Sequence, residues 1–119
     1  YGTKILINEL TARSLGEEFA IRELDKIRAK GQEQIESIYE LCGLKVDMSD
    51  GELSAHKFFA EAREFYQKKD WESAADKFEE ALAIVAEDMP AKVLYERTKG
   101  FVDRKPDKNW DGVFNIDEK

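Results

Sequence analysis

Few residues of this chain have types and spacing that could support chemistry, and Lys30 is the first of them. It stands beside Gly31 in a polar run, residues 30–34, between two apolar segments. That pattern predicts a hairpin turn, in which glycine can take the positive φ that a tight connection requires. A lysine at the tip of a hairpin can present a flexible positive charge to a polyphosphate. The competing interpretation is a solvated turn residue, and the spacing alone favours it.

Cys42 and His56 are the other residues that could take part in a reaction. Cys42 is the single cysteine, so the sequence predicts neither an internal disulfide nor a cysteine-based zinc site. Nucleophilic catalysis by its thiol would need a nearby base, and the sequence suggests none. His56 is the lone histidine and is predicted to lie on a helix face. We therefore predict no catalytic residue and no metal ligand in this chain.

The acidic composition excludes some classes of partner. The chain has 119 residues and a formal net charge of −7, with 42% hydrophobic residues. A chain of this length fits one domain, or one small domain and part of another. The charge argues against binding to nucleic acid or anionic lipid, which normally requires a basic face. No run approaches the roughly 18 apolar residues of a membrane span. No signal peptide is visible either, so we expect a soluble, cytoplasmic protein.

Three successive segments have the apolar spacing of amphipathic helices, with steps of three and four residues. Each would expose an apolar stripe if it stood alone, so the three helices should pack on one another. The residues predicted to form this packing are Phe58, Phe65, Trp71, Ala74, Phe78, Ala81, Leu82, Leu94 and Tyr95.

Capping signals place the ends of these helices. Ser49 and Glu52 predict a capping box that starts the first helix near Asp50, which then runs to about Lys69. Asp70 is a good N-cap for the second. Pro90 suits the first turn of the third, which should end before Pro106. Gly100 lies inside that helix at a cost of about 1 kcal/mol relative to alanine.

The N-terminal third reads as a small sheet. Residues 4–7 predict a short strand, residues 12–15 a brief helix, and residues 19–29 a long strand or two strands with a bulge. Residues 35–41 predict the return strand, and residues 44–48 a linker. Near the C-terminus, alternation over residues 110–116 predicts a short strand or an extended arm, with Trp110 or Phe114 packed back on the body. The fold class is therefore α+β.

The helical part resembles a tetratricopeptide array, in which a helix pair repeats about every 34 residues. Its aromatic, small and large positions are matched by Phe65, Trp71, Ala74, Phe78, Ala81 and Leu82. There are departures: Ala86 stands where a proline is usual, and Glu61 stands where a leucine is usual. One and a half repeats are too few for a free-standing array, so the helices should lean on another domain. Any amphipathic three-helix bundle remains the alternative.

Three segments of the N-terminal third follow one another as in a class III adenylate/guanylate cyclase catalytic domain: Tyr1–Ile7, Phe19–Gly31 and Ile38–Leu41. That family reads "YGT-I-I", "RELD-V-VKGK" and "IYEL" at similar spacing. The tail is similar to tails on many bacterial cyclases of this class, through Pro90–Thr98 and Trp110–Phe114. The resemblance implies that residues 1–43 close the catalytic domain and that residues 44–119 form a tetratricopeptide-like tail with an extended C-terminus.

The resemblance also implies a division of chemical roles. In that family the 3′-hydroxyl of ATP attacks the α-phosphate, two aspartates hold magnesium or manganese, and a turn lysine meets the terminal phosphates. Only the lysine has a counterpart here, Lys30, while the second turn lysine of the family is Gln32. The metal aspartates would lie upstream of Tyr1. Because the chain begins with Tyr1 rather than Met, we expect it to be a piece of a longer protein. Because the metal aspartates would lie outside it, we expect this piece to bind no cofactor by itself.

The leading hypothesis is thus a non-catalytic C-terminal fragment of a bacterial adenylate cyclase that makes cyclic AMP. The parent would be the enzyme, with ATP as substrate and the rest of the catalytic domain as partner. It would be a homodimer whose membrane anchor, if it has one, lies upstream. The fragment would serve a structural, dimerisation or regulatory role. The alternative is a stand-alone tetratricopeptide-like interaction module. The purine-selecting positions would be upstream, so the sequence does not choose ATP over GTP.

Overall fold

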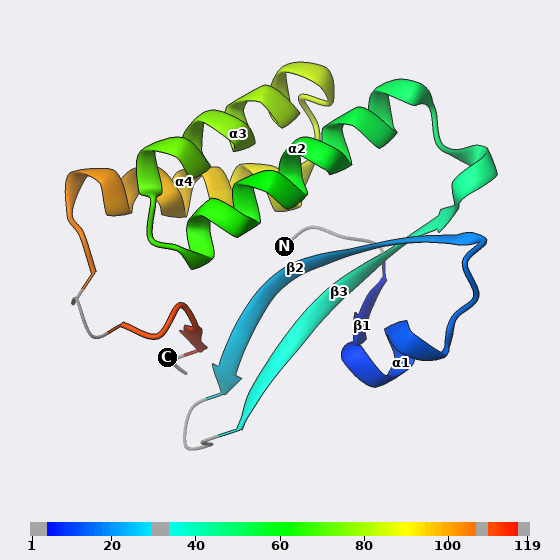
Figure 1. Ribbon diagram of the computed structural model, residues 1–119, viewed down its shortest axis with the longest axis horizontal. Coiled ribbons are helices and arrows are strands. Elements are labelled where there is room, and N and C mark those ends of the chain that lie inside the picture. Colours follow the sequence, from blue (N-terminus) through cyan, green and yellow to red (C-terminus); the bar gives the residue numbers. More distant parts are fainter. Residues whose placement is uncertain (1–4, 30–33, 107–109, 117–119) are drawn as a thin grey trace. The chain divides into compact units, whose positions relative to one another are not determined.

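The computed structural model describes residues 5–29, 34–106 and 110–116, and their fold is α+β, as predicted (Figure 1). Contacts divide the chain into two compact units. The helical unit is Met48–Trp110. The sheet unit combines Lys4–Asp47 with Asp111–Lys119, so the chain leaves the sheet unit, builds the helices and then returns.

The described residues of the sheet unit form four strands in the order β1-β3-β2-β4. Their bounds are Leu6–Asn8 for β1, Phe19–Ala29 for β2, Ile35–Leu44 for β3 and Phe114–Ile116 for β4. Strands β1 and β2 run antiparallel to β3, whereas β4 runs parallel to β2. The predicted C-terminal extension therefore ends as an edge strand of the sheet.

The long strand β2 is irregular, which agrees with the bulge considered from its sequence. Its register against β3 shifts between Ala20 and Ile21 and again between Glu23 and Asp25. Gly43 faces the first shift with a φ of 123°, a value that favours glycine. Strand β3 consequently continues to Leu44, three residues beyond the predicted end. The predicted linker contains a short 3-10 helix, η1, at Lys45–Asp47.

The short helix α1, Glu9–Ser14, begins earlier than predicted. The side chain of Asn8 accepts a hydrogen bond from the backbone N–H of Thr11, which caps the helix at that point. The prediction placed this helix at residues 12–15. It was wrong because it did not treat Asn8 as an N-cap.

The helical unit contains α2, Asp50–Gln67, α3, Trp71–Ile84, and α4, Met89–Asp103. The predicted starts of these helices are confirmed. Ser49 and Glu52 form both hydrogen bonds of a capping box, and the Asp70 side chain accepts from the N–H of Ser73. Pro90 lies in the first turn of α4. Lys69, between α2 and α3, has a φ of 64°.

The core of the helical unit lies along α3, which packs against both α2 and α4. Phe59 and Phe78 meet edge to face with ring centroids 5.4 Å apart. Small residues on all three helices allow close approach, and Thr98 satisfies its buried hydroxyl by donating to the carbonyl of Leu94 at 2.6 Å. The buried small residues are Ala55, Ala62, Ala74, Ala81 and Ala91.

Five of the nine predicted packing residues are buried: Trp71, Ala74, Phe78, Ala81 and Leu94. The other four, Phe58, Phe65, Leu82 and Tyr95, are partly exposed. The sequence also predicts that Phe59 and Tyr66 point inward, and these are the two aromatic residues of α2 that are fully buried, each one position after Phe58 and Phe65. Neighbouring aromatic pairs made the centre of the stripe ambiguous, since one residue turns a helix by about 100°.

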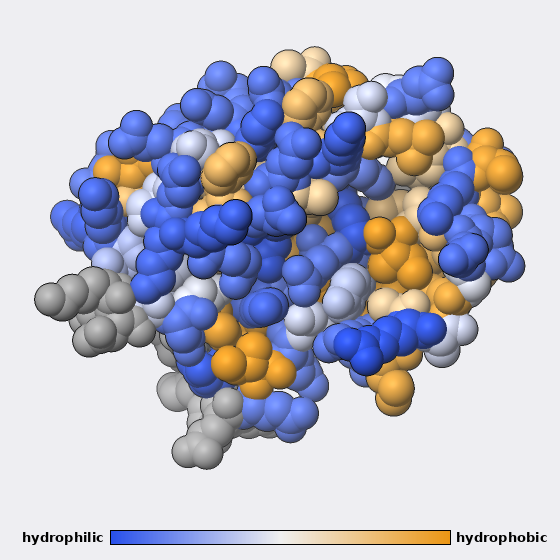
Figure 2. Space-filling view, viewed as in Figure 1, coloured by the Kyte–Doolittle hydropathy of each residue, from blue (hydrophilic) through white to orange (hydrophobic). Residues whose placement is uncertain are grey.

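Hydrophilic side chains dominate the face shown in Figure 2, with separate hydrophobic patches among them. The large apolar residues that are most exposed in the described part of the chain are Leu10 and Val46. Among the residues that the structure describes, no helix combines the length and the apolar character that a membrane span requires.

Candidate functional site

Lys30, the predicted triphosphate contact, lies outside the described residues, but the strand that leads to it is described. Strand β2 ends at Ala29, immediately before Lys30 in the sequence. Ile27 and Arg28 pair with β3 on one side and with β4 on the other, and Ala29 pairs with β4. Ile27 and Arg28 therefore lie in the interior of the sheet rather than at its edge.

An ion pair ties this end of β2 to the C-terminal segment. The guanidinium of Arg28 donates to Asp111 Oδ2 at 2.8 Å, and the other carboxylate oxygen of Asp111 accepts from the N–H of Val113 at 3.1 Å. The hydrogen bond from Arg28 lowers the pKa of Asp111 from its ordinary value. Val113 is buried, and Phe114 then pairs with Ile27 as β4 begins. Strand β4 falls within the strand or extended arm predicted for residues 110–116, but the sequence did not predict the ion pair of Arg28 with Asp111.

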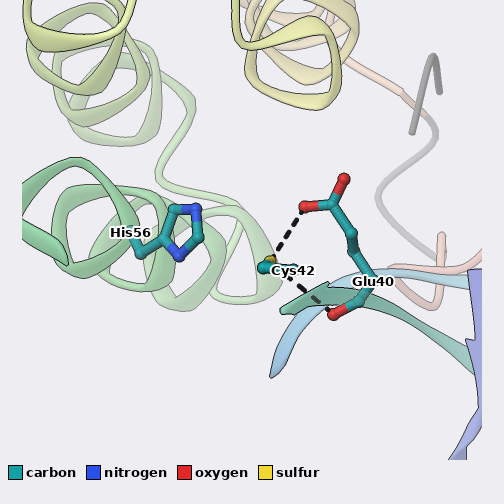
Figure 3. Close-up of side chains that lie close together, drawn as sticks. All are labelled: Glu40, Cys42 and His56. Carbon is teal, nitrogen blue, oxygen red and sulfur yellow. Dashed lines mark hydrogen bonds between the residues drawn. The ribbon is translucent and has the colours of Figure 1, made fainter. Parts of the chain in front are cut away.

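A second polar cluster joins the middle of β2 to β3. Arg22 Nε donates to Glu40 Oε1 at 2.8 Å, and both side chains are largely buried. The thiol of Cys42 donates to the same carboxylate oxygen at 3.2 Å (Figure 3). Residues 22 and 40 are paired across the two strands, so their register brings the charges together.

Within the sheet unit, the groups around Cys42 do not favour a thiolate. A reactive cysteine needs a base that removes its proton and a setting that stabilises the thiolate. Glu40 is a carboxylate whose charge is already balanced by Arg22, and a second negative charge beside it would be repelled. The cluster satisfies buried polar groups of the sheet. Sequence reasoning did not single out Arg22 or Glu40, because only the register of β2 against β3 joins them.

In the helical unit, four aromatic rings form one cluster: Tyr66, Trp71, Phe101 and Trp110. Trp71 lies 4.8 Å from Phe101 and 5.5 Å from Trp110 between ring centroids. Tyr66 meets Trp71 edge to face at 5.4 Å. The prediction that Trp110 or Phe114 packs back on the body is confirmed for Trp110.

Two cavities lie beside this cluster on the surface of α3 and α4. The first, about 350 Å³, is lined by Lys69, Asp70, Trp71, Glu72, Val102, Lys105 and Pro106. The second, about 300 Å³, shares Glu72 and Val102 with the first and is also lined by Ala75, Asp76, Lys99 and Asp103. Both cavities are lined by acidic and basic side chains together with a few apolar ones. Such surfaces suit a polar ligand or a peptide better than an apolar molecule.

Hydrogen bonds on the outer side of the helices hold α3 to its neighbours. The Tyr95 hydroxyl donates to Glu79 at 2.8 Å, which raises the pKa of Tyr95. Lys77 lies 3.3 Å from both Glu61 and Glu80 and above the ring of Phe58. Phe58 and Tyr95, predicted as core residues, thus lie at the edge of the helix contacts.

Comparison with known proteins gives one informative likeness. The chain is 26% identical over 101 residues to the terminal-differentiation-specific adenylate cyclase of Dictyostelium discoideum. The match covers 82% of this chain and 5% of that protein, so the chain spans a small part of its relative. No family model matches the chain, and no solved structure does. These findings support a relationship to an adenylate cyclase.

Proposed function

We propose that this chain is the C-terminal part of a bacterial class III cyclase that makes cyclic AMP from ATP. The sheet unit would supply the last strands of the catalytic domain, and the helical unit would be a tetratricopeptide-like tail that braces or regulates it. The observation that carries the proposal is the likeness to an adenylate cyclase over 82% of the chain. The ordered segments Tyr1–Ile7, Phe19–Gly31 and Ile38–Leu41 support the same family.

The antiparallel pairing of β2 with β3 is compatible with this role. The second and third family-like segments fall on these two strands, and Lys30 follows β2 directly. In the proposed reaction the 3′-hydroxyl of ATP bonds to the α-phosphorus and pyrophosphate leaves. Lys30 would neutralise charge on the terminal phosphates as they depart. Magnesium or manganese, held by aspartates outside this chain, would polarise the α-phosphate.

The first test uses the natural protein that contains this chain together with the residues that precede Tyr1. That protein should form cyclic AMP from ATP in the presence of Mg²⁺ or Mn²⁺, as a cytoplasmic homodimer. Addition of a chelator should abolish the product. A well-folded protein that forms neither cyclic AMP nor cyclic GMP with either metal would count against the proposal.

The role of Lys30 is tested in the same protein. Lys30→Ala should raise KM for ATP roughly ten- to hundredfold, the value of one or two charge-assisted hydrogen bonds. Gln32→Ala is the matched control from the same polar run and should leave KM unchanged. If both variants bind ATP as the parent does, Lys30 is a solvated turn residue.

The two cavities on α3 and α4 favour a second candidate, a protein-interaction module. In that case a partner captured by the full chain should be lost on Val102→Asp, since Val102 lines both cavities. Leu53→Asp is the matched control, because Leu53 is similarly exposed but lies on α2. A partner that survives Val102→Asp, or is lost equally with both variants, does not use the cavities.

A further inference from the structure

The two cavities beside the aromatic cluster adjoin each other, since Glu72 and Val102 line both of them. Together they form one groove between the first turns of α3 and the end of α4. All of the residues that line it belong to the helical unit. The groove is therefore one candidate binding surface within one compact unit.

The half of the groove that extends along α3 is acidic. Its described charged residues are three carboxylates and one ammonium group: Glu72, Asp76, Asp103 and Lys99. The Lys99 ammonium lies 5.1 Å from the centroid of the Tyr95 ring, which attracts it. Among the described residues, Asp76 and Asp103 form no ion pair. This half consequently presents net negative charge beside the apolar side chain of Val102.

The other half of the groove, at the start of α3, contributes positive charge. Lys69 and Lys105 line it together with the aromatic side chain of Trp71. Its carboxylate Asp70 caps the helix, since it accepts from the backbone N–H of Ser73 at 3.3 Å. The positive end of the helix therefore compensates the charge of Asp70, and the two lysines determine the sign of this half.

We propose that this groove binds an extended peptide that carries a basic side chain two positions away from a carboxylate. The basic side chain would enter the acidic half, and the carboxylate would face Lys69 and Lys105. Trp71 lines only the first half and Asp76 only the second, and they are separated by about 7.5 Å along the axis of α3. Two residues of an extended chain span about 6.6 Å, which matches that separation.

Opposite charges at the two ends of the groove explain why we favour this partner. Complementary charges fix the register and direction of a bound chain, whereas an apolar ligand would leave the carboxylates and lysines without a counterpart. The inference rests on the second candidate function, the interaction module, and specifies the chemistry of its partner.

Titration of the full chain with synthetic peptides tests the proposal. Acetyl-Ala-Arg-Ala-Glu-Ala-amide and acetyl-Ala-Glu-Ala-Arg-Ala-amide present the two charges in opposite chain directions. One of them should shift the indole N–H signal of Trp71 and the amide signal of Val102 in NMR spectra, with a dissociation constant of about 1 mM or lower. Acetyl-Ala-Gln-Ala-Gln-Ala-amide is the uncharged control and should shift neither signal. If neither charged peptide shifts these signals at several times that concentration, the proposal fails.

Charge reversal in the protein separates recognition from a structural effect. Asp76→Lys should weaken binding of the responding peptide about fivefold or more, since one partly exposed attraction is lost and a repulsion replaces it. A peptide with glutamate in place of that arginine should bind Asp76→Lys better than it binds the parent. Glu87→Lys is the matched control, because Glu87 is an exposed carboxylate in the turn between α3 and α4 and lines neither cavity.

Two further outcomes would overturn the proposal. If Asp76→Lys and Glu87→Lys weaken binding equally, the peptide responds to the overall charge of the protein rather than to the groove. If a natural partner is lost on Val102→Asp while no charged peptide binds, the interaction module stands and only the proposed chemistry of its partner is wrong. Formation of cyclic AMP enters neither measurement, so the cyclase proposal is tested separately.

Discussion

Gly100 is an exposed residue in the second half of α4, and a Cβ built there would meet nothing within 4 Å. Glycine inside a helix costs backbone entropy that alanine does not. Gly100→Ala should therefore raise the free energy of unfolding by about 0.5–1 kcal/mol, measured by urea denaturation.

Gly43 supplies the matched control for that substitution. It also has open space around its Cα, but its φ of 123° is one that residues with a Cβ rarely adopt. Gly43→Ala should lower stability for this reason. A higher free energy of unfolding for Gly43→Ala, or a lower one for Gly100→Ala, would show that backbone conformation does not decide the two outcomes.

At the scale of the helices, Phe78 and Phe58 allow a buried packing residue to be compared with a half-exposed one. Phe78 is fully buried against Phe59, whereas Phe58 is partly exposed beneath Lys77. Phe78→Ala should cost about 3–5 kcal/mol. Phe58→Ala should cost less than about half of that, because folding removes less apolar surface from water at Phe58 than at Phe78. Equal losses in thermal or urea unfolding would mean that Phe58 is a core residue, as its sequence position first suggested.

The capping box of α2 should make stability depend on pH. The pKa of Glu52 is lowered from its ordinary value of 4.5, chiefly because its carboxylate accepts from the backbone N–H of Ser49. A carboxylate with a depressed folded pKa contributes stability above its unfolded pKa and loses it as the pH falls through the folded pKa.

Comparison of the parent with Glu52→Gln measures this contribution. The parent should be the more stable at neutral pH, and the difference should shrink as the pH is lowered below about 4.5. The helical signal during urea unfolding provides the measurement. A difference that is constant from neutral pH to below that value would assign the effect to shape rather than to charge.

Local signals explain why the three long helices could be predicted closely. Ser49, Asp70 and Pro90 act within one turn of their own positions, and a helical stripe needs no partner to be visible. The adjacent pairs Phe58–Phe59 and Phe65–Tyr66 show the limit. Spacing alone does not say which member of such a pair is central, since that depends on where α3 packs.

For the molecule as a whole, the strand order and the polar clusters could not be predicted. Arg28 and Asp111 are 83 positions apart, and nothing near either residue specifies the other. Arg22 meets Glu40 only through a register that two irregularities in β2 displace. The predicted contact at Lys30 came from a family resemblance rather than from geometry. The sequence predicted elements well, whereas contacts between distant elements required the structure.

The parallel pairing of β4 with β2 has a consequence for the order of folding. When β4 pairs with β2, the chain between Ala29 and Phe114 is closed into a loop. The entropic cost of closing this long loop is larger than that of forming the β2–β3 hairpin or the helix pairs. We therefore expect β4 to add after the rate-limiting step, so that Asp111→Asn speeds unfolding and leaves the folding rate nearly unchanged in stopped-flow kinetics. A slower folding limb would place this contact in the nucleus. Strand β4 would then be the last strand to pair during folding and the first to separate during unfolding.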